Sequence, residues 1–208
     1  MTTGAVFPTE TVLSDGSVYR VVPVETGVRA IRAWVEHPWP MSPAQALALR
    51  DRLGWTSSLT NERMFTTDHG IGEKDASFNT IEAGGDTRTV SSFHLSLTSR
   101  IPKPVRAEAV PTAGRAFDAY VEALTAVYGQ GKRSRNRGVL SVKWTLPSDT
   151  LVNIGTIGRV VSVDVNSPAL NEIARGEAQY FAEIADENDV PYIDIDNPDS
   201  IDIDNPDS

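Results

Sequence analysis

The chain of 208 residues contains no cysteine. This absence excludes disulfides, thiolate zinc sites, iron–sulfur clusters and cysteine nucleophiles, and it is typical of a protein that stays in a reducing compartment. Long apolar runs are also missing, since none approaches the roughly 20 residues that a membrane helix requires. The first residues lack the basic and apolar regions of a signal peptide. We therefore expect a cytoplasmic protein that does not enter a membrane.

Basic residues are absent from the C-terminal end. The octapeptide IDIDNPDS occupies 193–200 and is repeated at 201–208, and ten carboxylates but no Lys or Arg follow residue 182. Removing these carboxylates changes the net charge from −9 to +1, so the body of the chain is nearly neutral. Because the acidic end has little apolar surface to bury, we expect a disordered tail over 185–208.

Motifs for metals, cofactors and catalysis are missing as well. In the tail, Pro198 and Asp199 stand where a calcium-binding EF-hand loop after Asp196 needs an oxygen ligand and a glycine. The segment 129–132, Gly-Gln-Gly-Lys, lacks the earlier glycine of a phosphate-binding loop, and no Gly-x-Ser-x-Gly motif is present. We expect no metal, no cofactor and no enzymatic activity.

Three helices are predicted from their caps and apolar spacing. Ser42 precedes a proline and is followed at three residues by Gln45, which is the pattern of a capping box. Apolar residues recur at steps of three and four over 115–128, and Gly129 follows as a stop. A third helix is predicted after Ser167 and is expected to end where the acidic run begins.

Alternation of apolar and polar residues predicts strands between these helices. An Asp-Gly pair near the N-terminus also predicts a hairpin, because it tolerates the positive φ angles of a tight turn. The expected strands cover 92–97, 140–146, 151–157 and 161–165, and the expected hairpin turn covers 14–17.

These elements predict an α+β fold with one or two antiparallel sheets and helices on one face. A helix followed by about three strands occurs over 42–101 and again over 112–166, which suggests a duplicated unit. A proline-rich segment between them is expected to be a linker. We therefore predict a single domain over 1–184, with possible halves 1–101 and 112–184, followed by the tail over 185–208.

A concentrated group of positive charges lies between the second helix and the next strand, in a segment that we expect to be a loop. This group could bind a phosphate, an RNA backbone or an acidic protein, or it could simply be a solvated connector. A nearly neutral body and the lack of an adjoining aromatic platform argue against nucleic acid. The four residues are Lys132, Arg133, Arg135 and Arg137.

A second candidate for partner binding is acidic. Carboxylates at the C-terminal end could contact a basic partner or screen the basic segment. These residues are Asp186, Glu187, Asp189, Asp194 and Asp196.

The histidines are weaker candidates for a functional site than these charged residues. His69 follows Asp68 in a glycine-containing segment that we interpret as an exposed turn, and His94 lies on the polar face of a predicted strand. Neither has the neighbours that a catalytic or metal site requires.

Four local phrases resemble a poorly characterised actinobacterial family of small α+β proteins. They are the ends of the first two helices at 53–55 and 124–129, the strand around Trp144 with the turn at 146–150, and the helix start at 167–172. The resemblance covers roughly residues 42–184. Such families are often encoded near secreted toxins, so the resemblance implies an immunity role.

Three functions follow as hypotheses. The first is an immunity protein that neutralises a cognate bacterial toxin by occupying its active site. The second is a secretion or assembly chaperone that binds an extended client segment along a sheet edge, for which the possible repeat is the motivation. The third is a nucleic-acid-binding protein that uses the basic segment. The sequence leaves the oligomeric state open.

Overall fold

The computed structural model describes residues 9–85 and 87–188. The chain divides into two compact units, Met1–Asn171 and Glu172–Ser208. The boundary between them falls inside the last helix, before the end that we predicted at residue 184. The predicted tail over 185–208 lies almost entirely outside the described residues.

The fold is α+β. The first part of the chain forms β1 (Glu10–Val12), β2 (Val18–Arg20), α1 (Val24–Val35), α2 (Pro43–Arg52), β3 (Thr56–Ser58), β4 (Asn61–Thr66), β5 (Ala76–Glu82) and β6 (Arg88–Ser96). The second part forms the 3₁₀ helix η1 (Lys103–Ala109), α3 (Val110–Tyr128), β7 (Lys132–Asn136), β8 (Val139–Thr145), β9 (Leu151–Thr156), β10 (Val161–Asn166) and α4 (Pro168–Asn188).

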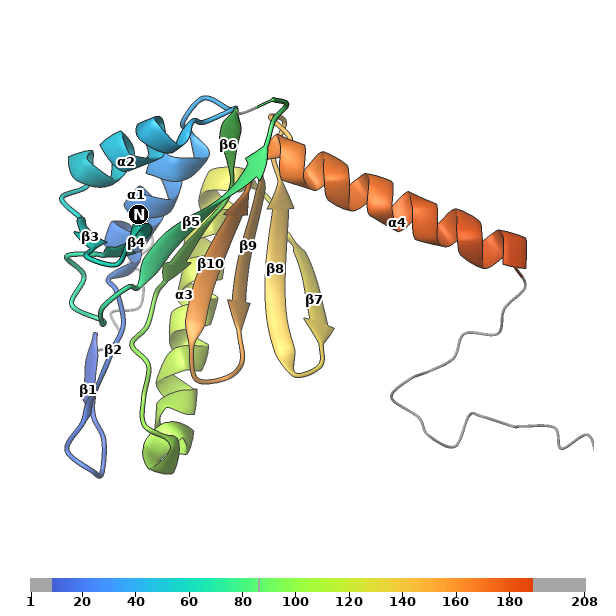
Figure 1. Cartoon of the computed structure of the whole chain (residues 1–208). Coiled ribbons are helices and arrows are strands. Elements are labelled where there is room, and N and C mark those ends of the chain that lie inside the picture. The colour runs from blue at the N-terminus through green and yellow to red at the C-terminus, as the bar shows by residue number, and fades with distance from the viewer. Residues whose placement is uncertain (1–8, 86, 189–208) are drawn as a thin grey trace, which may run out of the picture. The chain divides into compact units, whose positions relative to one another are not determined.

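Eight strands form one antiparallel sheet in the order β3-β4-β5-β6-β10-β9-β8-β7, and β1 pairs with β2 alone. Each half of the chain contributes four consecutive strands, so the repeated unit contains four strands where we predicted about three. The last strands of the two halves, β6 and β10, meet antiparallel at the centre of the sheet (Figure 1). This arrangement is that of two half-sheets joined edge to edge.

Helices α1, α2 and α3 pack on one face of this sheet (Figure 1). Apolar side chains at alternate strand positions face them, and Trp34 of α1 stacks on Phe93 of β6 with ring centroids 4.0 Å apart. Both side chains are fully buried, and burial of each such aromatic contributes about 1.5–3 kcal/mol. The opposite face of the sheet carries mostly polar side chains, with Val139 of β8 also on this face.

Several local predictions are confirmed. Ser42 caps α2, and both hydrogen bonds of its capping box with Gln45 are present. Gly129 ends α3 with a φ of 79°. The predicted strands correspond to β6, β8, β9 and β10, and the predicted hairpin corresponds to β1 and β2.

Other predictions were wrong or incomplete. The expected linker forms η1 and the first turn of α3, because Pro104 and Pro111 occupy first-turn positions where no backbone N–H is needed. The helix α4 continues through the acidic run to Asn188. Helix α1 was not predicted, although Val28, Ile31 and Val35 have helical spacing.

Across residues 9–85 and 87–188, no helix combines the length and the apolar character needed to cross a bilayer.

Candidate functional site

A hollow lies on the sheet face opposite α1, α2 and α3. Its floor crosses four strands, where Ser134 of β7 pairs with Ser141 of β8, Ser141 with Gly155 of β9, and Gly155 with Ser162 of β10. Because these side chains are small, the surface sinks between the longer residues around them. The resulting hollow has a volume of about 820 Å³, and we call it the basic groove.

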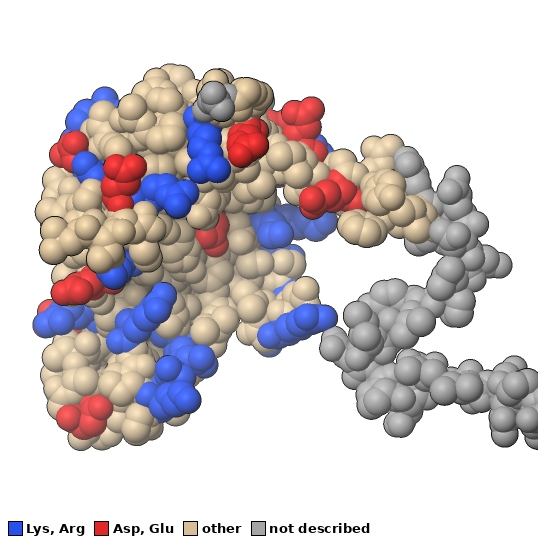
Figure 2. All heavy atoms as spheres, in the orientation of Figure 1, with Lys and Arg blue, Asp and Glu red and all other residues tan. Residues whose placement is uncertain are grey.

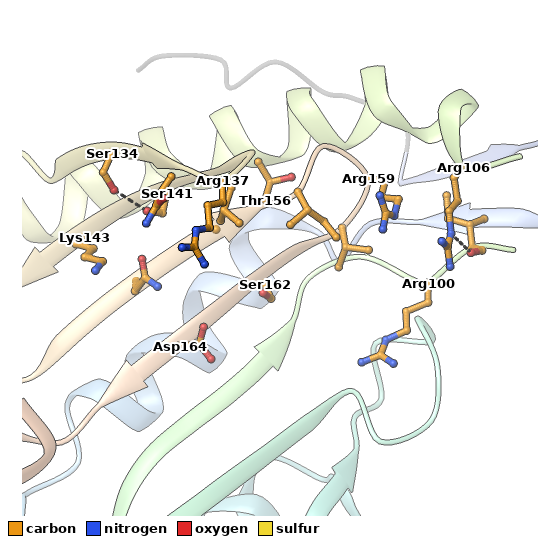
Figure 3. A pocket seen from close by; sticks show the side chains of 17 residues that line it. Arg100, Arg106, Ser134, Arg137, Ser141, Lys143, Thr156, Arg159, Ser162 and Asp164 are labelled. Atoms are coloured by element: carbon orange, nitrogen blue, oxygen red, sulfur yellow. Dashed lines mark hydrogen bonds between the residues drawn. The ribbon is translucent and has the colours of Figure 1, made fainter. Parts of the chain in front are cut away.

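Five cationic side chains line this groove. Arg137 lies in the turn between β7 and β8, Lys143 lies on β8, and Arg159 lies in the turn between β9 and β10. Arg100 follows β6, and Arg106 lies in η1. Figure 3 shows Lys143 at one end of the groove, the arginines of residues 100, 106 and 159 at the other, and Arg137 between them. In Figure 2, Lys and Arg side chains lie at several places over the same side of the molecule.

Asp164 of β10 is the one carboxylate among the described residues that line the groove. Its Oδ1 lies 2.7 Å from Nδ1 of His94, directly across the β6–β10 pairing. Asp164 is therefore already engaged by a neighbour outside the groove. A single partnered carboxylate does not neutralise five cations, so the groove carries a positive potential.

Within the described residues, the side chains of Arg100, Arg106, Lys143 and Arg159 make few bonds to the protein. Arg106 Nε donates to the carbonyl oxygen of Ile101 at 3.2 Å. Within residues 9–85 and 87–188, the ion pairs of the structure do not include Arg100, Lys143 or Arg159. The backbone of Arg159 is nevertheless held, because its carbonyl oxygen accepts from Tyr19 Oη at 3.1 Å. The fold thus holds the backbone of this turn, while the half-buried side chain of Arg159 lines the groove.

The basic segment predicted as a loop is an edge strand. Lys132, Arg133 and Arg135 belong to β7, and Arg137 has a φ of 45° in the following turn. Alternation along the strand places Arg133 and Arg135 on the helix side of the sheet, where the Arg133 guanidinium carbon lies 5.8 Å from the ring centroid of Phe117. The four charges are therefore divided between two faces, and only Arg137 lines the groove.

The acidic candidates lie beyond the side chains that the structure describes. Asp186 and Glu187 belong to the end of α4, where side chains are not described. Asp189, Asp194 and Asp196 lie outside the described residues.

Sequence reasoning missed four of the five groove cations. Arg100 and Arg106 follow β6, far in sequence from Lys143 and Arg159, and the pairing of β6 with β10 brings the two pairs to one groove. One indication was available beforehand. The polar positions of three predicted strands are occupied by small residues at Ser141, Gly155 and Ser162, which is unusual for a solvated sheet face.

His69 packs against neighbouring side chains of the fold. His69 lies in a turn, as expected, and its neighbours Asp68 and Gly70 are exposed. Its own side chain is only 5% exposed, so the expectation of an exposed histidine was wrong. Its ring meets Trp55 edge-on with centroids 5.8 Å apart, and its Nε2 lies 3.6 Å from Asp68. Burial lowers the pKa of His69 below its ordinary value of 6.5. The described residues contain no cluster of three or more His, Asp or Glu side chains that could hold a metal ion.

Comparisons with known proteins point to one family. A model of a family of unknown function, DUF6301, matches residues 25–167, which include all but the first residue of α1, the helices α2 and α3, and the whole eight-stranded sheet. No curated protein and no solved structure matches the chain. Since the matched region is more than half of the chain and contains every strand of the groove, the chain belongs to the family of unknown function DUF6301.

Proposed function

We propose that this chain is a non-enzymatic protein-binding protein that docks an anionic surface of its partner in the basic groove. The observation that carries the proposal is the gathering of five cationic side chains around one hollow of the sheet. Charges of one sign above a low-dielectric floor concentrate the local field and accelerate association with an oppositely charged partner. Arginine also pairs carboxylates through two parallel hydrogen bonds.

A protein partner suits the groove better than a nucleic acid. The described lining contains no aromatic side chain, so unpaired bases would find no surface on which to stack. Ser141, Asn153 and Ser162 instead offer short polar groups that can bond to carboxylates and peptide groups.

The specific role that we propose is neutralisation of a cognate bacterial toxin in the cytoplasm. Two arguments support this role: the sequence resemblance to immunity-like proteins, and the chemistry of the groove. Hydrolytic active sites commonly contain paired carboxylates or carboxylate-bound metal ions. A cationic groove bound over such carboxylates would block the entry of substrate. In the complex that we propose, the toxin therefore contacts the basic groove and not the acidic tail.

Partner capture from the native host tests this function. The tagged full-length chain is compared with an Arg100→Glu/Arg159→Glu variant and with Arg135→Glu, which reverses a charge on the opposite side of β7. We expect one stoichiometric partner that is lost from the double variant and retained by the control, and whose toxicity the wild-type chain suppresses. A partner held equally by all three proteins, or no stoichiometric partner, contradicts the proposal. Circular dichroism confirms that each variant is folded.

A chaperone is the second candidate, and one observation favours it. All five residues of the edge strand β7 are exposed, and an extended client could add to that edge as a further strand. Binding to an unfolded client peptide, together with homodimerisation, would support this function. A monomer that binds only a folded enzyme would exclude it.

A further inference from the structure

We infer that the basic groove takes an extended acidic segment of about six residues, with carboxylates at its two ends and an uncharged middle, lying across the sheet from β7 to the end of β6. The inference rests on the proposed function, because it specifies which part of the partner protein occupies the groove. Three features of the groove support it: its length, the placement of its charges, and a glycine in its floor.

The length of the groove sets the length of the segment. Its lining extends from Ser134 on β7 to Arg100, which follows β6. In the sheet order, four strand spacings separate β7 from β6, and at about 4.8 Å each they cover about 19 Å. An extended chain advances about 3.3 Å per residue, so about six residues reach from one end to the other.

The placement of charges sets the pattern of the segment. Arg100, Arg106 and Arg159 lie at one end, and Lys143 lies at the other (Figure 3). Between them lie Arg137, Ser141 and the carboxylate of Asp164, and the opposite charges of Arg137 and Asp164 leave the middle of the groove with no excess positive charge to attract a further carboxylate. Acidic residues at both ends, separated by small polar residues, therefore complement the groove.

Gly155 gives independent support, because the fold does not require a glycine at this position. A β-carbon built there would meet its nearest atom, the carbonyl oxygen of Leu140, at 3.8 Å, which is an ordinary contact. Its φ also lies outside the positive region that favours glycine. Glycine in the middle of a strand costs stability and often marks a place where another backbone approaches closely. The floor of the groove is thus open at the point where the segment would cross β9.

The same position offers a test that separates binding from folding. A β-carbon at Gly155 meets no atom closer than 3.8 Å, so Gly155→Ala should fold and be at least as stable as the wild type. Gly155→Val adds a larger side chain of high strand propensity at the same position. Both variants should nevertheless bind the acidic segment more weakly, because their added methyl groups occupy the part of the groove through which the segment would pass. Thr145→Val is the matched control, since Thr145 lies on the same face of β8 outside the groove lining.

Fluorescence anisotropy with the full-length chain measures the effect. The probe is the labelled hexapeptide Glu-Glu-Ser-Ser-Glu-Glu, with Ser-Ser-Glu-Glu-Ser-Ser and Lys-Lys-Ser-Ser-Lys-Lys as comparisons. We expect the first peptide to bind best, Gly155→Val and Arg100→Glu/Arg159→Glu each to weaken it about tenfold or more, and Thr145→Val and Arg135→Glu to change it less than about threefold.

Other outcomes overturn the inference in distinguishable ways. If the captured partner still requires Arg100 and Arg159 but no acidic peptide binds and Gly155→Val has no effect, the segment is wrong while the protein-binding function stands. If no partner is captured and no peptide binds, both fail. Tighter binding of a six-nucleotide RNA than of any peptide would identify the groove as a nucleic-acid site and also overturn both.

Discussion

Gly27 of α1 lies directly against the ring of Tyr120 of α3. A β-carbon at Gly27 would stand 2.1 Å from Tyr120 Oη and 2.7 Å from two ring carbons, so no larger residue fits without displacing the ring. The ring itself is held in place, because its hydroxyl donates to the carbonyl oxygen of Val22 at 3.0 Å. This contact sets how closely α1 and α3 approach over the sheet.

Gly27→Ala should therefore destabilise the protein, by about 1–3 kcal/mol, because overpacking outweighs the gain in helix propensity. Urea unfolding measures the change. Gly114→Ala in α3 is the control, since a β-carbon there meets nothing within 4 Å. It should raise the free energy of unfolding by about 0.5–1 kcal/mol. Equal effects of the two substitutions would show that the contact with Tyr120 does not restrict the helices.

Tyr120→Phe should lower the free energy of unfolding by about 1–2 kcal/mol, because it leaves the buried carbonyl oxygen of Val22 without this donor. Tyr180→Phe provides the comparison, since Tyr180 is 60% exposed on α4 and its hydroxyl can be solvated. The two variants are compared by the same urea titration. A loss below 0.3 kcal/mol for Tyr120→Phe, about the error of such measurements, would mean that the hydroxyl is not needed.

Protonation of His69 should lower the free energy of unfolding at acidic pH. Burial lowers its pKa in the folded state below the ordinary 6.5, so the unfolded chain binds more protons near that pH. The free energy of unfolding should be unaffected by this group above about pH 7.5 and should decrease as the pH falls through 6.5. Urea unfolding at several pH values between 8 and 5 gives the slope. In His69→Gln the free energy of unfolding should depend less steeply on pH. An unchanged dependence would mean that another group causes the loss of stability.

Arg159→Gln should leave stability unchanged or raise it by up to about 0.5 kcal/mol at low ionic strength, because it removes one of several neighbouring like charges. Sodium chloride should reduce the difference from the wild type by screening the remaining repulsion. Thermal unfolding at low and high salt measures both effects. A loss of more than 1 kcal/mol would reveal a structural role for this guanidinium, and the groove would then be less available to a partner.

Local signals in the sequence determined many of the elements. The Ser42 capping box, the stop at Gly129 and the alternating residues of β6 and β8 act within a few residues of one another, so their outcome depends little on the rest of the chain. The edge strand β7 could not be recognised in this way. Both of its faces are exposed, so its sequence carries no alternation of apolar and polar residues.

The sequence by itself determined the α+β class, the approximate repeat and the concentration of acid at the C-terminal end. Only the tertiary structure decided where the basic groove lies. Arg100 and Arg159 are far apart in the chain, and they meet because β6 pairs with β10 at the centre of the sheet. That pairing depends on the burial of Phe93, Val163 and their neighbours beneath α1 and α3, a long-range effect that no local pattern specifies.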